Sequence, residues 1–464
     1  MGRNVLRRRR VGVGVPQDSR RVSVLLGVLF GLAGMGSSSA AIVLPRVAED
    51  FGVGVGVAAW SISLYVLMLA VTTAVHGRVS DLVGVRLPLL VGIGMMTGGA
   101  LVASLAPSFG VLLVARMFQG AGAAAIPTLG VALLSARYHG EVRALALGRL
   151  AGLAAAVSCF GPLVGGLVES AWGWRAVMAL PILGLVVLPF LWRTLTGGGT
   201  GARLDVLGAV LVASTAAGLV LLLQSPTTGR LVAEAGLLLV LVGVPLVAMW
   251  VRRRPDGFLP LEVVRNKTVV RSAVAAAAVP AAWFALLVGV PAVLVGHGWE
   301  PWQVGTLLLP GAAFALWVPR HVGPLLERFG APRCLAVSGL VAAAALVLAA
   351  VGTAVPAAWA LVPAVILATI GFGIGQPALM ASVGDAVTHD VRGVALGVAT
   401  LLFLVGGSIG SAAVAGLGDL VGVPGSLAIL AAFPLAGIAV LAPELRRPRV
   451  SPRQVVEVQR RSGA

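Results

Sequence analysis

Long apolar stretches constrain this chain more than any other feature of its sequence. Fourteen of them are about 20 residues long, the length that a helix needs to cross a bilayer. Charged residues make up only 11% of the 464 residues, against roughly 25% in soluble domains. We therefore expect an all-α membrane protein. The predicted spans are 22–45, 57–77, 87–106, 108–134, 144–168, 175–192, 205–224, 231–251, 272–295, 302–322, 335–354, 356–380, 393–416 and 423–442.

The positive charges lie between these stretches and alternate from side to side. If the amino terminus is cytoplasmic, 29 of the 34 Lys and Arg residues fall in cytoplasmic tails and loops, and 3 fall in outside loops. This asymmetry satisfies the positive-inside rule, so we predict an even number of crossings with both termini in the cytoplasm. The net charge of +17 then reflects orientation in the membrane, and we expect no nucleic-acid partner.

The first span has an alternative interpretation as a cleaved signal peptide. Arg7 to Arg10 precede an apolar run, and small residues follow at 36–41. However, the hydrophobic run continues to Pro45, and thirteen remaining helices would place the two basic tails on opposite sides. We therefore interpret this span as a membrane helix.

Two loop sequences recur in the second half of the chain. The loop Gly77-Arg-Val-Ser-Asp81-Leu-Val-Gly84-Val-Arg86 is echoed 246 residues later by Gly323-Pro-Leu-Leu-Glu327-Arg-Phe-Gly330-Ala-Pro-Arg333. Residues 142–148 (VRALALG) are echoed at 391–397 (VRGVALG), an offset of 249. These offsets relate helices 1 to 6 to helices 9 to 14 and leave helices 7 and 8 as an inserted pair.

Parallel six-helix halves are typical of transporters that bind a substrate near mid-membrane, where the halves meet. We predict a basic cytoplasmic tail at 1–21, an N-terminal six-helix bundle at 22–192, a connector with two inserted helices at 193–270, a C-terminal six-helix bundle at 271–442 and a basic cytoplasmic tail at 443–464.

Three motifs carry a resemblance to a known family. They are the loop from Gly77 to Arg86, the run Arg116-Met-Phe-Gln119-Gly120-Ala-Gly122-Ala-Ala in the fourth span, and Gly161-Pro162-Leu-Val-Gly165-Gly166 in the fifth. With them the chain resembles the major facilitator superfamily, specifically its fourteen-helix drug:proton antiporters, nearest the tetracycline exporters of Gram-positive bacteria. The resemblance covers almost the whole chain. It implies the major facilitator fold, with two pseudo-symmetric six-helix bundles plus an inserted helix pair.

The loop motif can form a charged latch. Glycines allow a tight turn, and Asp81 can accept hydrogen bonds from a helix N-terminus or pair with a neighbouring arginine. An ordinary solvated loop acid is the alternative. The resemblance implies a cytoplasmic gate made of Gly77, Arg78, Asp81, Gly84 and Arg86, with Glu327 as the counterpart in the second half.

Arg116 lies deep in the fourth span, roughly 12 Å below its outer end. At that depth we expect it to face a watery cavity or a partner, with a snorkelling arginine as the alternative. The resemblance implies a part in proton coupling. Gln119 shares its helix face and could hydrogen-bond a substrate.

Pro162 removes a backbone donor, exposes the carbonyl of Ser158 and bends the fifth helix. Gly161, Gly165 and Gly166 let a neighbouring helix approach closely. Ordinary small-residue packing explains these glycines equally well. The resemblance implies an external seal that marks exporters rather than importers.

One feature of the family is missing. Its exporters commonly carry a membrane-embedded acid in helix 1, 5 or 13, and none of the 17 acids here is central in a span. An unpaired buried charge is costly, so we expect neutral, zwitterionic or anionic cargo rather than a permanent cation. Proton coupling then rests on the resemblance alone, because the titratable candidates lie toward the cytoplasm: His76, Asp81, Glu327 and Asp385.

A largely apolar cavity with a few hydrogen-bonding groups would suit aromatic or polyketide-like molecules. Helix packing or lipid contact is the competing interpretation for each candidate. The candidates are Ser37, Ser38, Ser39, Gln119, Trp283, Phe284, Phe314, Trp317 and Gln376.

We predict a secondary transporter that exports small hydrophobic or amphipathic compounds, as in antibiotic efflux, by alternating access coupled to protons. An importer of the same fold and a transport-silent membrane sensor are the alternatives. No metal-ligand cluster, phosphate-binding loop or nucleophile elbow occurs, so we expect no enzyme activity, no metal and no cofactor. We expect a monomer in the cell membrane.

Overall fold

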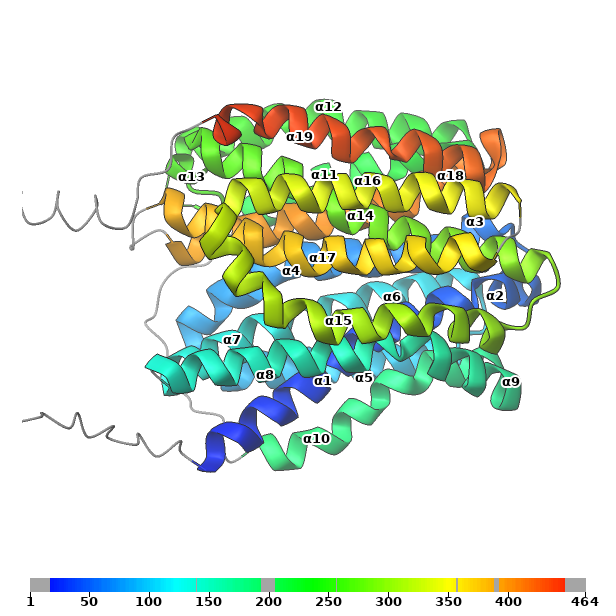
Figure 1. The fold of residues 1–464 in the computed structure, drawn as a ribbon, viewed down its shortest axis with the longest axis horizontal. Coiled ribbons are helices and arrows are strands. Elements are labelled where there is room, and N and C mark those ends of the chain that lie inside the picture. Colours follow the sequence, from blue (N-terminus) through cyan, green and yellow to red (C-terminus); the bar gives the residue numbers. More distant parts are fainter. Residues whose placement is uncertain are drawn as a thin grey trace, which may run out of the picture.

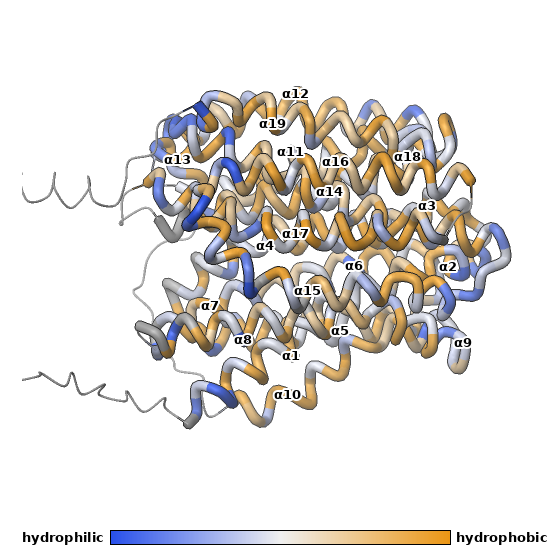
Figure 2. The backbone as a smooth tube through the Cα atoms, viewed as in Figure 1, coloured by the Kyte–Doolittle hydropathy of each residue, from blue (hydrophilic) through white to orange (hydrophobic). Residues whose placement is uncertain are grey.

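The computed structural model describes residues 17–138, 140–192, 205–255, 257–355, 358–387 and 392–446. Every regular element in these ranges is a helix (Figure 1). Apolar residues run along the helices, and polar ones gather at their ends (Figure 2). Helices satisfy their own backbone hydrogen bonds, which lipid cannot do for them, so this architecture follows from the apolar runs.

The described residues up to 192 form ten α-helices and one 3₁₀ helix, and several crossings consist of two helical pieces. The elements are α1 (Gln17–Ile42), α2 (Leu44–Phe51), α3 (Val55–Ala58), α4 (Trp60–Val83), α5 (Arg86–Ser104), α6 (Phe109–Ala123), α7 (Ala125–Arg137), α8 (Gly140–Cys159), α9 (Gly161–Ala179), η1 (Leu180–Leu183) and α10 (Gly184–Leu191).

The rest of the described chain begins with the inserted pair and continues with longer helices. The elements are α11 (Val206–Thr228), α12 (Arg230–Arg253), α13 (Leu261–Arg265), α14 (Lys267–Gly296), α15 (Pro301–Phe329), α16 (Ala331–Ala354), α17 (Ala358–Ala386), α18 (Arg392–Leu430) and α19 (Ala432–Leu445).

The described residues hold eleven helices that are long and apolar enough to cross a membrane, or twelve with the bent α15 counted as one span. Two of them, Leu145–Leu191 and Ala395–Leu445, have 47 and 51 residues, more than twice the roughly 20 that one crossing needs. Each is broken at a glycine with positive φ, Gly173 at 76° or Gly422 at 74°. With these two counted as pairs, the structure is consistent with the fourteen predicted crossings.

Positive-φ glycines reveal the duplication directly. Six of the seven described glycines of this kind form pairs whose members are 246 or 249 residues apart, and the seventh lies in the inserted pair. Only glycine adopts this backbone region readily, so the same turns recur in both halves. The pairs are Gly52 with Gly298, Gly84 with Gly330, and Gly173 with Gly422; the seventh is Gly229.

Helix packing follows the same symmetry. Within the halves, α1 packs on α8 as α14 packs on α18, and α5 packs on α6 as α16 packs on α17. Between the halves, α4 packs on α18 and α9 packs on α15, which are equivalent positions. The inserted helix α11 packs on α18 and α4, while α12 packs mainly on α11 and is largely exposed.

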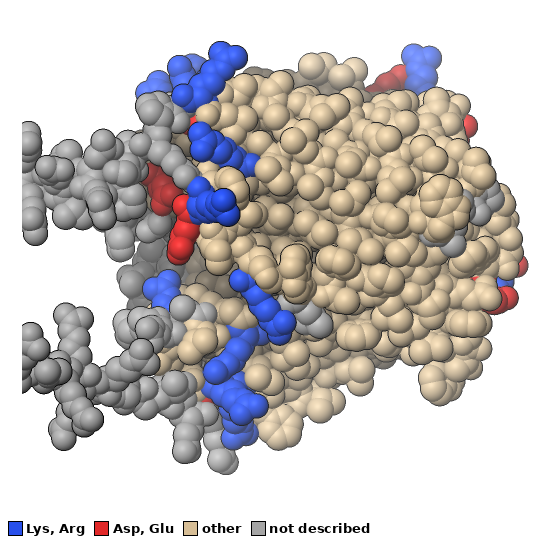
Figure 3. All heavy atoms as spheres, viewed as in Figure 1, with Lys and Arg blue, Asp and Glu red and all other residues tan. Residues whose placement is uncertain are grey.

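The start of α1 and the end of α19 lie at the same end of the molecule (Figure 1). Lys and Arg side chains gather at that end, whereas the visible surface along the middle of the helices carries almost no charged side chains (Figure 3). This distribution is what a bilayer-spanning protein with an even number of crossings requires. The first helix begins at Gln17, five residues before the predicted start of the first bundle.

Candidate functional site

A pocket lies between the two halves, and the empty space within it and at its open mouth together is about 410 Å³. No charged residue lines it, and its polar side-chain groups belong to two serines, one cysteine and the indole of Trp283. Such a surface fits an uncharged apolar molecule that makes a few hydrogen bonds. The lining residues are Ser38, Ser158, Cys159 and Pro162 from the first half, and Trp283, Leu286, Leu287, Leu308, Gly311, Ala312 and Val365 from the second.

The bend beside this pocket arises from Pro162. Helix α8 ends at Cys159 and α9 begins at Gly161, because Pro162 has no N–H to donate to the carbonyl of Ser158. The Ser38 hydroxyl donates to that carbonyl instead, at 2.9 Å. The Ser158 hydroxyl donates in turn to the carbonyl of Gly31, at 3.2 Å. These two bonds tie α1 to the bent helix at the pocket wall.

The glycines of this motif contact two different neighbours. Gly161 and Gly165 face Ser38 and Ser39 of α1, with no room for a side chain. Gly166 faces the other half, where a Cβ would lie 2.5 Å from the Cα of Trp302. The two halves therefore meet backbone to backbone along the contact between α9 and α15.

A cluster of charges lies at the end of the molecule beyond this contact. Arg46 of α2 is 3.4 Å from Glu49, 3.5 Å from Glu169 of α9 and 3.7 Å from Glu300, which precedes α15. We call these four residues the outer ion cluster. Its Arg46–Glu300 contact crosses between the halves, and so it holds them together where they are exposed to solvent.

Arg116 on α6 is fully buried. Its Nε donates to the carbonyl of Ser61 at 3.1 Å, and its Nη1 donates to the carbonyl of Gly36 at 3.0 Å and to Oε1 of Gln119 at 2.7 Å. Its Cζ lies 4.3 Å from the centre of the Tyr65 ring, a cation–π contact. Arg116 thus has partners in α1 and α4, and none of the ion pairs among described side chains includes it.

The predicted cytoplasmic gate is described only in part. Gly84 ends α4 with φ 79°, a conformation that favours glycine, and the guanidinium of Arg86 stacks on Trp192 at 4.4 Å. Gly77 lies inside α4, and Glu327 is exposed on α15. The side chains of Arg78 and Asp81 lie outside the described residues, so their gating role stays a prediction.

The remaining cavity candidates are dispersed. Ser37 is buried in α1, and the Ser39 hydroxyl donates to the carbonyl of Met35 at 2.6 Å. Phe284 packs near Gly407 of α18 rather than lining the pocket. Gln376 is half-buried on α17.

Phe314 and Trp317 meet edge to face on α15, with ring centres 6.2 Å apart. Trp317 is 49% exposed and stacks on His321, away from the pocket lining. Of the nine candidates, the pocket brings together Ser38 and Trp283.

Sequence reasoning did not single out most of the apolar pocket wall. Leu286 and Leu287 follow Trp283 by three and four residues, so helical spacing places all three on one face and could have found them. Leu308 and Val365 carry no such signal, because an apolar residue in a membrane helix fits lipid, core or pocket equally well.

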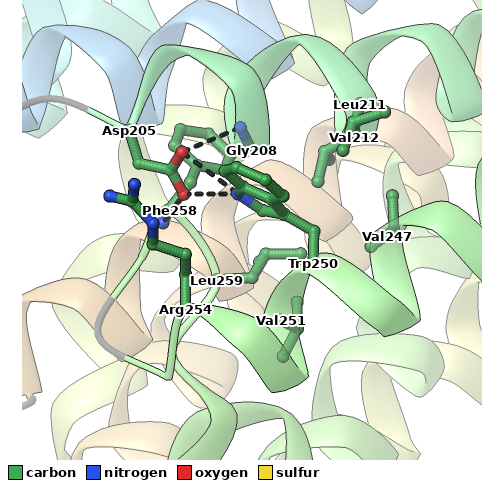
Figure 4. Close-up of a pocket in the computed structure, with 10 residues that line it drawn as sticks. All are labelled: Asp205, Gly208, Leu211, Val212, Val247, Trp250, Val251, Arg254, Phe258 and Leu259. Carbon is green, nitrogen blue, oxygen red and sulfur yellow. Dashed lines mark hydrogen bonds between the residues drawn. The ribbon is translucent and has the colours of Figure 1, made fainter.

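A second pocket, of about 210 Å³, surrounds Asp205 at the start of α11 (Figure 4). The carboxylate accepts hydrogen bonds from the backbone N–H groups of Gly208 (3.0 Å) and Phe258 (2.8 Å) and from the Trp250 indole (3.1 Å). Partial burial acts to raise the pKa of Asp205, but these hydrogen bonds and nearby Arg254 outweigh it and lower the pKa below its ordinary value. This carboxylate ties the inserted pair to the segment after it.

Comparison with known proteins identifies relatives along the chain. A family model described as Major Facilitator Superfamily matches residues 26–411 and 321–462. Multidrug resistance protein Stp of Mycobacterium tuberculosis is 30% identical over 301 residues, which are 62% of this chain and 56% of Stp. The uncharacterized MFS-type transporter YwoD of Bacillus subtilis is 35% identical over 188 residues, 39% of this chain and 41% of YwoD. The matched region thus spans about half the length of these relatives.

The fold also matches solved structures. A POT family transporter crystallised with 5-aminolevulinic acid superimposes with a TM-score of 0.66, covering 92% of this chain and 97% of that one at 14% identity. At this identity the likeness concerns the fold alone.

Proposed function

Because this chain belongs to the major facilitator superfamily and is therefore a multi-pass membrane transporter of small molecules, we propose that it exports hydrophobic or amphipathic compounds from the cytoplasm. The observation that carries the proposal is the uncharged pocket between the halves, bounded by Ser38, Pro162 and Trp283. Its position between the two halves is where alternating access would expose a bound molecule to each side in turn.

The uncharged pocket wall supports uncharged cargo. A permanently cationic compound would meet no carboxylate on the pocket wall, and a buried unpaired charge is costly. An aromatic, neutral molecule could stack on Trp283 and hydrogen-bond Ser38 or Ser158. Antibiotics of this kind are the substrates that we propose.

Export rather than import is supported by the motif at Gly161 and Pro162 and by the printed name of Stp, a multidrug resistance protein. Gly166 packs closely on Trp302, and this contact would close the pocket toward the outer ion cluster. We assign the end that carries both termini to the cytoplasm, so the cluster faces outward.

We propose that a proton gradient drives transport. We also propose that the protein works as a monomer. Family resemblance supports the coupling, and no central carboxylate supplies it in the described spans. We assign gating to Gly77, Arg78, Asp81, Gly84, Arg86 and Glu327, and the external seal to Gly161, Pro162, Gly165 and Gly166.

Transport by purified protein tests the proposal. Sealed vesicles that carry the protein, with an imposed pH gradient, should move hydrophobic antibiotics or dyes, and expressing cells should accumulate less of them. Higher accumulation would indicate an importer. Absence of transport across a broad panel, with and without the gradient, would favour a transport-silent sensor.

The pocket itself can be tested through Cys159, which lines it. In a Cys334→Ala background, Cys159 is the single thiol, because the chain has two cysteines. A transported compound should slow its modification by a small membrane-permeant thiol reagent by about threefold or more, since bound cargo covers the sulfur. The matched control is the Cys159→Ala protein, in which Cys334 is buried on α16. Unchanged labelling at saturating cargo would rule out this pocket as the binding site.

A further inference from the structure

Arg116 is a buried cation whose charge the described residues leave uncompensated. It has 0% exposure, and none of the ion pairs among described side chains includes it. Its neighbours are the carbonyls of Ser61 and Gly36, the amide of Gln119 and the ring of Tyr65, which offer partial charges only. A buried charge without a counter-ion is strongly unfavourable in a membrane interior, so this arrangement favours binding of an anion.

Unused hydrogen-bond donors accompany the uncompensated charge. Arg116 Nη2 and Gln119 Nε2 are both buried and have no hydrogen-bond partner. The two side chains are joined through Nη1 and Oε1 at 2.7 Å, which holds the guanidinium and the amide in one unit. Planar N–H donors of this kind match a carboxylate or a small halide, which accept hydrogen bonds without donating any.

The pair lies close behind the wall of the central pocket. Arg116 binds the carbonyl of Gly36, two residues before the pocket-lining Ser38. Between them lies Ser37, whose buried hydroxyl also has no partner. Val365, which lines the pocket from the second half, is the equivalent of Arg116 at the offset of 249. Small and polar residues of α1 thus separate the donors from the pocket.

We propose that Arg116 and Gln119 form a binding site for one monovalent anion, supplied either by a carboxylate group of the cargo or by a free halide. The carboxylate source rests on the proposed transport function, and the halide source does not. In both cases the anion neutralises Arg116 and accepts from Nη2 and from the Gln119 amide. A bound water would accept these hydrogen bonds but would leave the charge of Arg116 uncompensated. A water in place of the anion would overturn the proposal.

Thermal unfolding of the purified full-length protein tests the site without any transport. The midpoint should rise with the logarithm of sodium chloride or sodium acetate concentration, at ionic strength held constant with sodium sulfate, because a ligand that binds the folded state stabilises it. Near saturation the two anions should not add, since they compete for one site. A midpoint insensitive to both anions overturns the proposal.

Matched variants assign the effect to Arg116. Arg116→Met should abolish the dependence, whereas Arg175→Gln, which removes an equally charged but exposed arginine, should retain it. Gln119→Leu keeps the charge and removes one donor, so about tenfold more anion should be needed for the same rise. The proposal is overturned if the unfolding midpoint depends on anion concentration equally in Arg116→Met and in the wild type. If Arg116→Met does not fold, a Gln119→Leu titration equal to that of the wild type overturns it.

Transport then distinguishes the two sources. Arg116→Met should reduce transport of an acidic compound about tenfold or more relative to its neutral methyl ester if the cargo carboxylate binds there. Equal effects on acid and ester assign the site to free halide. Anion-dependent stability without transport of any compound would reject the proposed function and leave the anion site standing.

Discussion

Asp205 connects three backbone segments through one carboxylate, so it provides the sharpest stability test at the scale of a residue. Asp205→Ala removes the cap of α11 and the acceptor for Phe258 and Trp250. We expect a loss of about 1–3 kcal/mol in unfolding free energy, measured as a lower melting temperature in detergent. Asp419→Ala removes an exposed carboxylate of α18 and should change little. Equal losses in both variants would show that Asp205 contributes no more than surface charge.

The contribution of Asp205 to stability should change with pH in a defined direction. Because the pKa of folded Asp205 is lowered from 3.8, its contribution is present in full above that ordinary value and is lost as pH falls through the folded pKa. The difference in melting temperature between wild type and Asp205→Asn should therefore hold between about pH 5 and 7 and shrink only under stronger acid. A difference that disappears near pH 6 would contradict this account.

The sequence predicted the interactions of a residue correctly where they depend on neighbours a few positions away in the chain. Proline chemistry indicates that the carbonyl of Ser158 loses its helical partner, and the structure shows Ser38 donating to it. The depth of Arg116 predicted a watery cavity or a partner; the structure buries it among partners, and the sequence did not indicate Tyr65 as one of them. Which residue of α4 faces Arg116 depends on the rotation and crossing angle of two helices, and neither is written in a periodic apolar pattern.

At the scale of elements, the contact between α9 and α15 depends on glycine. Gly166→Ala would place a methyl group 2.5 Å from the Cα of Trp302 and 2.6 Å from the carbonyl oxygen of Pro301, so one backbone must move. We expect about 1–3 kcal/mol of destabilisation and faster labelling of Cys159 by reagents added outside. Gly98→Ala on α5 meets open space and is the control, with stability equal to the wild type or higher. Equal stability and equal labelling rates in the two variants would mean that the contact between α9 and α15 tolerates a side chain at position 166.

The order of elements was predictable from apolar length, but their internal breaks were not. The span predicted at 108–134 is two helices, α6 and α7, and the first span ends at Ile42 before the short α2. Pro45 explains the second break, because proline has no N–H to donate to the carbonyl of Ala41 and suits the first turn of a new helix. Ala124, between α6 and α7, has ordinary helical angles, but Pro127 has no N–H to donate to the carbonyl of Ala123, where α6 ends. Pro245 lies inside α12 without such a break, so proline alone does not predict one.

At the scale of the whole molecule, we expect the outer ion cluster to favour the state in which the halves are closed at that end. Glu300→Gln removes the ionic contact of Arg46 across the halves. Exposed ion pairs contribute at most about 1 kcal/mol, so the closed state should lose about two- to fivefold in population. Spin labels at Ser170 and Thr306 would measure the change as a longer distance between the halves.

A control for this prediction exists in the inserted pair. Glu234→Gln removes an ion pair with Arg230 inside one helix and should leave the distance distribution unchanged. If Glu300→Gln gives the same distribution as Glu234→Gln, the cluster does not hold the halves together.

The two contacts between the halves are equivalent in position but differ in chemistry. Between α4 and α18, Ser63 and Ser411 share a hydrogen bond of 2.9 Å, and the Ser408 hydroxyl donates to the carbonyl of Ser63. Between α9 and α15, glycines bring the backbones together and the outer ion cluster lies beyond them. The molecule is therefore symmetric in fold and asymmetric in the bonds that its halves must break to move apart.

The inserted pair extends this asymmetry to the surrounding lipid. Helix α11 covers the flank where α4 meets α18, and no described helix of the inserted pair covers the opposite flank, where α9 meets α15. Pro162 and Leu308, on the two helices of that bare flank, also line the pocket. A lipophilic compound dissolved in the bilayer would thus meet pocket-lining helices directly on that flank and the inserted pair on the other.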